Sequence, residues 1–106
     1  MSGQAMTEPN ASGTVLLTHE VGLHARPSVK LTKLAKAYAA RVELAASEAG
    51  PWIDAKSIVK VMATKAPKDT VLHFRAAGPD AAAAVEALIG LVARDFDEAV
   101  PDAASV

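Results

Sequence analysis

The sequence predicts a single α+β domain in which a four-stranded antiparallel sheet carries its helices on one face. Three observations support this fold. The chain has 106 residues, a length typical of one domain. Segments that alternate apolar and polar residues are interleaved with segments whose apolar residues recur at helical spacing. The connections between the expected strands are short, which favours antiparallel pairing with one solvated sheet face.

The chain is expected to open with a strand and a helix. Residues 14–19 (TVLLTH) alternate as a strand does. A helix is predicted over 26–38, because its apolar residues fall at positions i, i+3, i+4 and i+7: Leu31, Leu34, Ala35 and Tyr38. Pro27 lacks an N–H and is tolerated only in a first helical turn. This helix should therefore begin just after His24 or Ala25.

The remaining elements follow from the same two periodicities and from the turns between them. Strands are predicted over 41–46, 52–54 and 70–76, and helices over 56–63 and, after Gly78-Pro79-Asp80, from Ala81 to Phe96. Glu43, His73 and Arg75 should point to the solvated face of the sheet. We expect residues 13–97 to form the domain, with a disordered lead over 1–12 and a disordered tail over 98–106.

Composition excludes several classes of protein. The chain has no cysteine, which rules out disulfides, thiol nucleophiles and cysteine-based metal sites and fits a cytoplasmic protein. No apolar run approaches the ~18 residues of a membrane span. Aromatic residues make up only 4% of the chain, so a stacking platform for nucleic acid is not expected. We also expect a monomer without metal or organic cofactor.

Basic residues are concentrated in two segments of a chain whose net charge is −1. Residues 21–42 contain five bases and no acid, and residues 55–68 contain four bases and no acid. This pattern indicates one positive face and a negatively charged partner or substrate. The alternative is two solvated helix faces without a partner.

His24 is the strongest candidate for chemistry. It lies in Gly22-Leu23-His24-Ala25-Arg26-Pro27, where Pro27 places it at or near the N-cap of the first helix. The positive end of that helix would then stabilise an anion on the imidazole, and Arg26 could add a guanidinium. These features predict a phosphoryl-histidine site, with a merely capping histidine as the alternative. His19 and His73 are interpreted as surface histidines.

Ser57 is the second candidate, because serine at the start of the short helix is a good N-cap. A phosphate there would also be stabilised by the helix N-terminus. The short helix cannot bury all its aliphatic residues, so Ile58, Val59 and Met62 are predicted to contribute to an exposed docking patch. The alternative is a crowded core helix.

At these residues the sequence resembles a known family. The motif Gly22-Leu23-His24-Ala25-Arg26-Pro27, the Lys56-Ser57-Ile58 motif about thirty residues later, and a last helix after Gly78-Pro79-Asp80 are similar to those of the histidine-containing phosphocarrier HPr of the bacterial phosphotransferase system. The resemblance covers residues 14–96. It implies an open-faced β-sandwich with three helices, in the order βαββαβα.

The resemblance also implies a carrier, not an enzyme. His24 would accept a phosphoryl group on Nδ1 from phosphorylated enzyme I and pass it to an EIIA-type protein, for sugar uptake or for nitrogen or carbon regulation. Arg26 would stabilise that phosphoryl group, and Ser57 would be the regulatory serine that an HPr kinase/phosphorylase phosphorylates. The positions implied to dock partners are Leu23, Val29, Lys30, Lys33, Ile58, Val59 and Met62.

The 63–69 loop departs from the family, and two other functions are compatible with a chain of this size. The family usually has glycine after the short helix, whereas residues 63–69 contain Pro67 and no glycine, so this loop is expected to differ in shape. A small phosphatase of the acylphosphatase type would need a catalytic asparagine in a glycine-rich loop, and Asn10 alone does not supply one. A regulatory module acting only through Ser57 and the docking patch is the remaining alternative.

Overall fold

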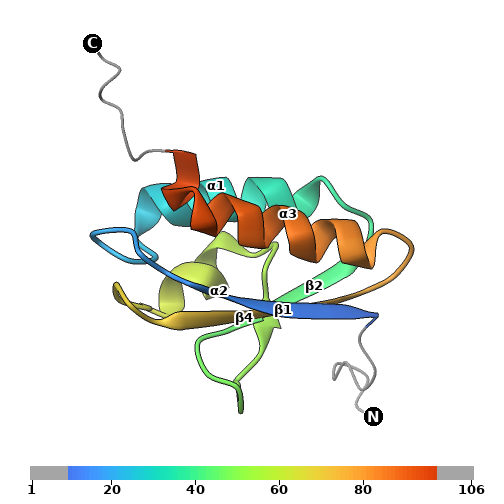
Figure 1. Ribbon diagram of the computed structural model, residues 1–106, viewed down its shortest axis with the longest axis horizontal. Coiled ribbons are helices and arrows are strands. Elements are labelled where there is room, and N and C mark those ends of the chain that lie inside the picture. The colour runs from blue at the N-terminus through green and yellow to red at the C-terminus, as the bar shows by residue number, and fades with distance from the viewer. Residues whose placement is uncertain (1–9, 98–106) are drawn as a thin grey trace.

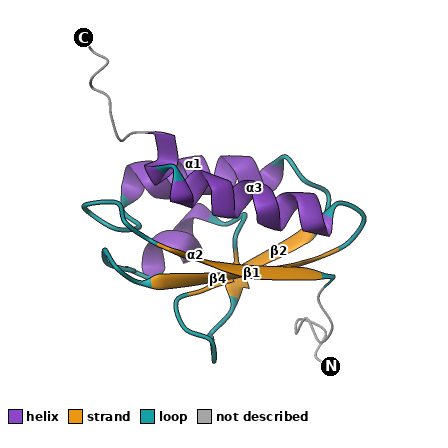
Figure 2. Ribbon diagram, viewed as in Figure 1, coloured by secondary structure: helices purple, strands orange, loops and turns teal. Residues whose placement is uncertain are grey.

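The fold is an open sheet covered on one face by three helices, as Figure 1 and Figure 2 show. It is described here from a computed structural model, over residues 10–97. The elements are β1 (Ala11–Leu16), α1 (Ala25–Lys36), β2 (Arg41–Ala45), β3 (Ile53–Asp54), α2 (Ile58–Ala63), β4 (Val71–Ala77), α3 (Ala81–Ala93) and a short 3-10 turn (Asp95–Asp97). The predicted α+β class and its open-faced arrangement are confirmed.

The strands lie in the order β1-β4-β2-β3, and every neighbouring pair is antiparallel. Strand β4 pairs with β1 on one side and with β2 on the other, so the last strand of the chain lies inside the sheet. Its alternation puts Leu72, Phe74 and Ala76 on the covered face, as the sequence predicts, and all three are fully buried.

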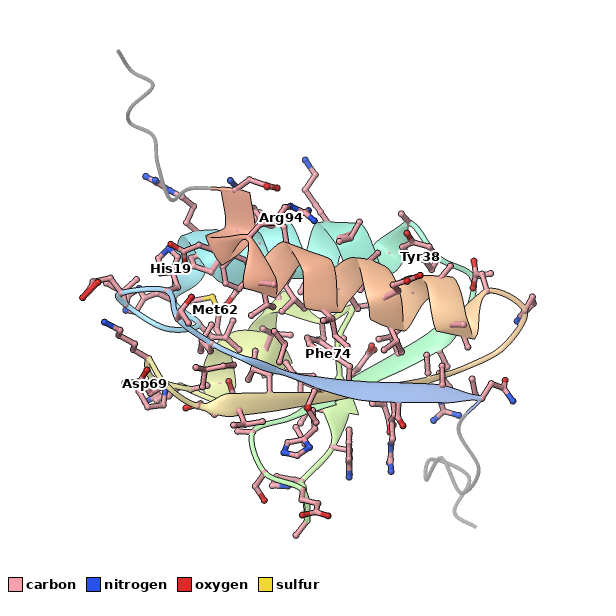
Figure 3. The ribbon with its side chains drawn as sticks, viewed as in Figure 1. His19, Tyr38, Met62, Asp69, Phe74 and Arg94 are labelled. Carbon is pink, nitrogen blue, oxygen red and sulfur yellow. The ribbon has the colours of Figure 1, made fainter. Side chains whose placement is uncertain are left out.

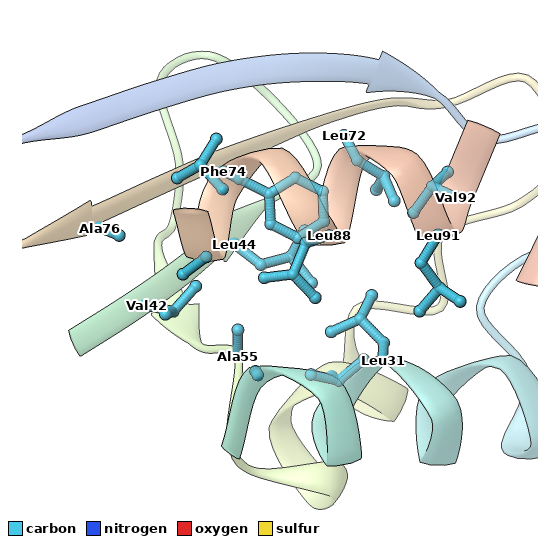
Figure 4. Packing of buried hydrophobic residues seen from close by; sticks show 14 of the residues in the cluster. Leu31, Val42, Leu44, Ala55, Leu72, Phe74, Ala76, Leu88, Leu91 and Val92 are labelled. Carbon is cyan, nitrogen blue, oxygen red and sulfur yellow. The ribbon is translucent and has the colours of Figure 1, made fainter. Parts of the chain in front are cut away.

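The hydrophobic core fills the space between the helices and the covered face of the sheet (Figure 4). Leu31 of α1, Leu44 of β2, Phe74 of β4 and Leu88 of α3 meet there and are completely buried. Each helix therefore contributes its apolar stripe to one core, which fixes the start of α1 relative to the sheet.

Every predicted strand and helix is present, and its ends lie within three residues of the predicted ones. Two of these shifts follow from hydrogen bonds that the local sequence pattern does not reveal. Strand β1 begins at Ala11, since the amide of Asn10 already donates to the carbonyl of Ala76 at 2.8 Å. Helix α2 begins at Ile58 because the Asp54 carboxylate holds the amide of Lys56 in a turn, at 2.9 Å. Strand β3 excludes Trp52. The lead predicted to be disordered over 1–12 is ordered from Asn10 onward, because Ala11 and Ser12 pair with β4 as part of β1. The rest of that lead, 1–9, and the predicted tail, 98–106, lie outside the described residues.

The outer face of the sheet is less solvated than predicted. Glu43 is only 9% exposed, and its carboxylate pairs with Arg75 at 2.7 Å. The Arg75 guanidinium in turn lies 4.0 Å from the centre of the Trp52 ring. Trp52 thus stacks on this ion pair and covers part of the face that β2 and β4 share.

Asp80 occupies the N-cap position of α3 but uses its carboxylate elsewhere. Its two oxygens accept the amides of Ala39 and Ala40 at 2.9 and 2.8 Å, which ties the turn before β2 to the start of α3. The amide of Ala39 is the main reason that the pKa of Asp80 lies below its usual value, because this bond favours the ionised form. Within residues 10–97, no helix combines the length and hydrophobicity needed to cross a membrane.

Candidate functional site

His24 is the residue immediately before α1, as the sequence predicts. It is the N-cap, with extended backbone at φ −83° and ψ −166°. Its side chain is exposed, and the imidazole makes no capping hydrogen bond to the helix. The ring is therefore not occupied as a helix cap, which removes the main support for the capping interpretation.

A sharp turn at Gly22 carries His24 to this position. Gly22 has φ +69°, a left-handed conformation that costs other residues energy, and a Cβ there would lie 2.3 Å from the carbonyl oxygen of Ala66. The next amide, that of Leu23, donates to the same oxygen at 2.9 Å. The turn before His24 is thereby clamped against the loop that follows α2.

Ser28 holds the same segment from inside the helix. It is completely buried, its hydroxyl donates to the carbonyl of Leu23 at 3.2 Å, and its amide donates to the carbonyl of His24 at 3.0 Å. The backbone on both sides of the imidazole is therefore fixed by one serine. Sequence reasoning gave Ser28 no role, because nothing in the local pattern shows that its hydroxyl turns inward.

The C-terminal end of α3 supports the site from a third side. Phe96, predicted to extend the helical stripe, lies beyond the end of α3 with φ +57° and is fully buried. The His19 ring meets its ring edge-on at 5.7 Å, and the Lys30 ammonium donates to its carbonyl at 2.9 Å. Figure 3 shows His19 at the end of the molecule where α1 begins.

Arg26 lies in the first turn of α1, two residues after His24, and its side chain is exposed. The first turn contains no acidic residue to oppose an anion. Amides of a first turn lack carbonyl partners within the helix, and the helix dipole is positive at this end. An exposed imidazole, a helix N-terminus and a guanidinium are thus brought together, which suits a nitrogen that carries a phosphoryl group.

Ser57 is the N-cap of α2, which confirms the predicted cap. Its hydroxyl accepts the amide of Lys60 at 3.3 Å, and its side chain is partly exposed. The helix that it caps has six residues, shorter than predicted.

The predicted docking residues divide into three groups. Val29, Lys33, Val59 and Met62 are exposed, Val59 most of all at 73%, and Ile58 is half-buried. The prediction of Leu23 as a docking residue is wrong, because Leu23 is 3% exposed and its side chain belongs to the hydrophobic core. Lys30 uses its ammonium to bind the carbonyl of Phe96, so the structure gives it an internal role.

The 63–69 loop, which has no glycine, places two non-glycine residues in the left-handed backbone conformation. Lys65 and Asp69 adopt positive φ values of 52° and 77°. The amide of Asp69 donates to the carbonyl of Leu17 at 2.7 Å, which stabilises this conformation and joins the loop to the end of β1. Over residues 10–97, no group of three or more His, Cys, Asp or Glu side chains is arranged to hold a metal ion.

Comparison with known proteins shows the family of the chain. The sequence model described as "PTS HPr component phosphorylation site" matches residues 11–94. The chain belongs to the HPr family. It is 39% identical over 82 residues to the phosphocarrier protein HPr of Cupriavidus necator, an alignment that covers 77% of this chain and 90% of that protein. It is 34% identical over 85 residues to the phosphocarrier protein NPr of Escherichia coli, covering 80% and 93% of the two chains.

Solved structures agree with the sequence comparisons. The HPr of Thermoanaerobacter tengcongensis superposes with a TM-score of 0.77 at 26% identity, over 85% of this chain and 99% of that chain. A mycoplasma histidine-containing phosphocarrier protein gives a TM-score of 0.70 at 33% identity, over 80% and 93%. As an HPr-family member the chain is a phosphocarrier of the phosphotransferase system and not an enzyme, which excludes the phosphatase alternative. The family works with enzyme I and with EIIA-type proteins.

Proposed function

We propose that this chain accepts a phosphoryl group on Nδ1 of His24 from phosphorylated enzyme I and passes it to a histidine of an EIIA-type protein. The carrying observation is the exposed imidazole at the N-cap of α1, which the helix does not use as a cap. The phosphoryl group would come originally from phosphoenolpyruvate, and transfer would take place in the cytoplasm with the chain acting as a monomer.

The chemistry is an in-line displacement. The His24 nitrogen forms a bond to phosphorus on one side while the donor's nitrogen–phosphorus bond breaks on the other, through a loose, metaphosphate-like state. The protein contributes position and charge. The clamp at Gly22 and the bonds from Ser28 hold the backbone, and the helix N-terminus and Arg26 stabilise the moving negative charge.

Arg26→Ala is expected to slow phosphorylation of His24 roughly 10- to 100-fold, because a hydrogen bond to a charged group is lost. Its melting temperature should stay within about 2 °C of wild type, since an exposed side chain in a first turn contributes little to the core. Single-turnover transfer from phosphorylated enzyme I measures the rate. Arg26→Lys keeps the positive charge, so its transfer rate should lie between those of wild type and Arg26→Ala. A steep loss of stability with normal transfer by the folded fraction would make Arg26 structural.

Phosphorylation of Ser57 is proposed to regulate the encounter with enzyme I. The docking surface consists of four exposed residues, Val29, Lys33, Val59 and Met62, together with the half-buried Ile58. A negative charge at Ser57 would lie at the edge of this surface, beside Ile58 and Val59, and would weaken attraction to an acidic partner. The same charge meets the N-terminus of α2, so the fold should tolerate it.

Ser57→Asp is therefore expected to raise the KM of enzyme I for this protein about tenfold, with an unchanged or slightly higher melting temperature. Higher salt should reduce the difference in KM between Ser57→Asp and wild type, because screening also weakens the attraction between the wild-type protein and enzyme I. Ser57→Asn serves as the control, since asparagine is a good N-cap without the charge. Equal KM values for the Asp and Asn variants at low salt would show that Ser57 is only a cap.

The downstream branch is proposed to be sugar uptake or nitrogen or carbon regulation, since both an HPr and an NPr are among its relatives. The test is to phosphorylate the protein with enzyme I and phosphoenolpyruvate and to offer it a panel of EIIA proteins from both branches. Rapid transfer to one class identifies the branch. Transfer to none would favour the alternative, a regulatory module that acts mainly through protein contacts.

A further inference from the structure

Val21 is an exposed aliphatic side chain that the fold does not explain. It lies in the turn before Gly22, three residues ahead of His24, and is 58% exposed. Among the large exposed hydrophobic residues of the described chain only Val59 is more accessible. A valine here adds little to the core, so its apolar side chain is accessible to another molecule.

The turn presents Val21 in a defined position. Its amide donates to Nδ1 of His19 at 3.3 Å, and the amide of Gly22 donates to the carbonyl of His19 at 2.9 Å. His19 itself packs edge-on against the buried Phe96. A β-branched side chain has few rotamers, so binding Val21 costs little conformational entropy.

The turn that carries Val21 lies beside the loop that follows α2. The clamp between Leu23 and Ala66 places its turn beside the loop that leaves α2, the helix that carries Val59 and Met62. Glu20, the residue before Val21, forms an ion pair with Lys68 of this loop, with 3.5 Å between carboxylate and ammonium. The charges next to Val21 therefore offset each other, and the exposed feature of the turn is its apolar side chain.

We propose that Val21 enters an apolar pocket on phosphorylated enzyme I, and that it helps to select this donor. The inference rests on the proposed function of His24. In-line transfer brings the donor's phosphohistidine into contact with the His24 imidazole, so the donor's surface also covers the rigid turn three residues away. The exposed valine defines the complementary chemistry, which is an apolar pocket in the donor's surface.

The test is Val21→Thr, which keeps the shape and replaces one methyl group with a hydroxyl. We expect the KM of enzyme I for this protein to rise roughly five- to tenfold, because an apolar pocket cannot pair the hydroxyl. The kcat should not change, since the reacting groups are untouched, and Val21→Ile should keep a KM close to wild type. Melting temperature should be unchanged for both variants.

Val71→Thr is the matched control, because Val71 is 45% exposed and lies on the outer face of β4, away from the helices. It should leave KM and kcat as in wild type. An unchanged KM in Val21→Thr, or an equal rise in Val71→Thr, would overturn the proposal while leaving phosphorylation of His24 intact. Failure of the unchanged protein to be phosphorylated on His24 would instead overturn the proposed function, and this inference with it.

Discussion

Replacing His24 with alanine is expected to abolish phosphorylation of the protein by enzyme I and phosphoenolpyruvate while leaving its melting temperature unchanged. The substitution removes the nucleophilic nitrogen, and no other group is proposed to accept the phosphoryl group. The stability of the fold should not change, because the imidazole is exposed and makes no capping hydrogen bond. Phosphate incorporation followed by mass spectrometry, together with thermal unfolding, measures both effects.

His73→Ala is the appropriate control. His73 lies on the outer face of β4, where its ring meets Trp52 edge-on at 6.4 Å. Because this face is remote from the start of α1, the variant should be phosphorylated at the wild-type rate. Label that persists in His24→Ala, or that disappears in His73→Ala, would place the acceptor elsewhere.

Gly22→Ala is expected to produce the largest loss of stability among the substitutions considered, about 2–4 kcal/mol of unfolding free energy. The positive φ is unfavourable for alanine, and the new Cβ would lie 2.3 Å from the Ala66 carbonyl oxygen and 2.9 Å from Cα of Pro67. Both neighbours are backbone atoms, so the turn itself must shift. Since this turn carries His24, phosphorylation by the folded fraction should also slow.

Gly90→Ala separates this effect from a general response to an added methyl group. Gly90 lies within α3, and a Cβ there would meet only Nη1 of Arg94, the movable end of a side chain, at 3.0 Å. The variant should match wild type or gain up to about 1 kcal/mol, because alanine is the better helix former. Chemical denaturation of both variants gives the comparison. A Gly22→Ala protein as stable as Gly90→Ala would show that the clamp is dispensable.

The position of His24 could be predicted from sequence because its determinants are local. Pro27 restricts where α1 begins, and the helical spacing after it fixes which face is buried. Strand β4 can also be predicted from sequence, since its apolar and polar residues alternate over the whole strand. Ser57 as a cap required only its place before a short helix.

Other parts of the site depend on contacts between distant segments, which local pattern does not encode. The place of Leu23 in the motif predicts a docking residue, but its amide donates to the carbonyl of Ala66 and its side chain is buried in the core. The bond between Lys30 and Phe96 joins residues 66 positions apart. The stacking of Trp52 on Arg75 likewise depends on strand order, which placed β4 beside β2.

The most direct test of the proposed role of His24 is the chemical identity of the phosphorylated product. The protein should be incubated with enzyme I and phosphoenolpyruvate, then examined by phosphorus–nitrogen NMR correlation and by stability of the label in acid and base. We expect one phosphoryl group, bonded to Nδ1 of His24, that is lost in acid and retained in base. An acid-stable product, or a phosphoryl group on any other residue, would contradict the role assigned to His24.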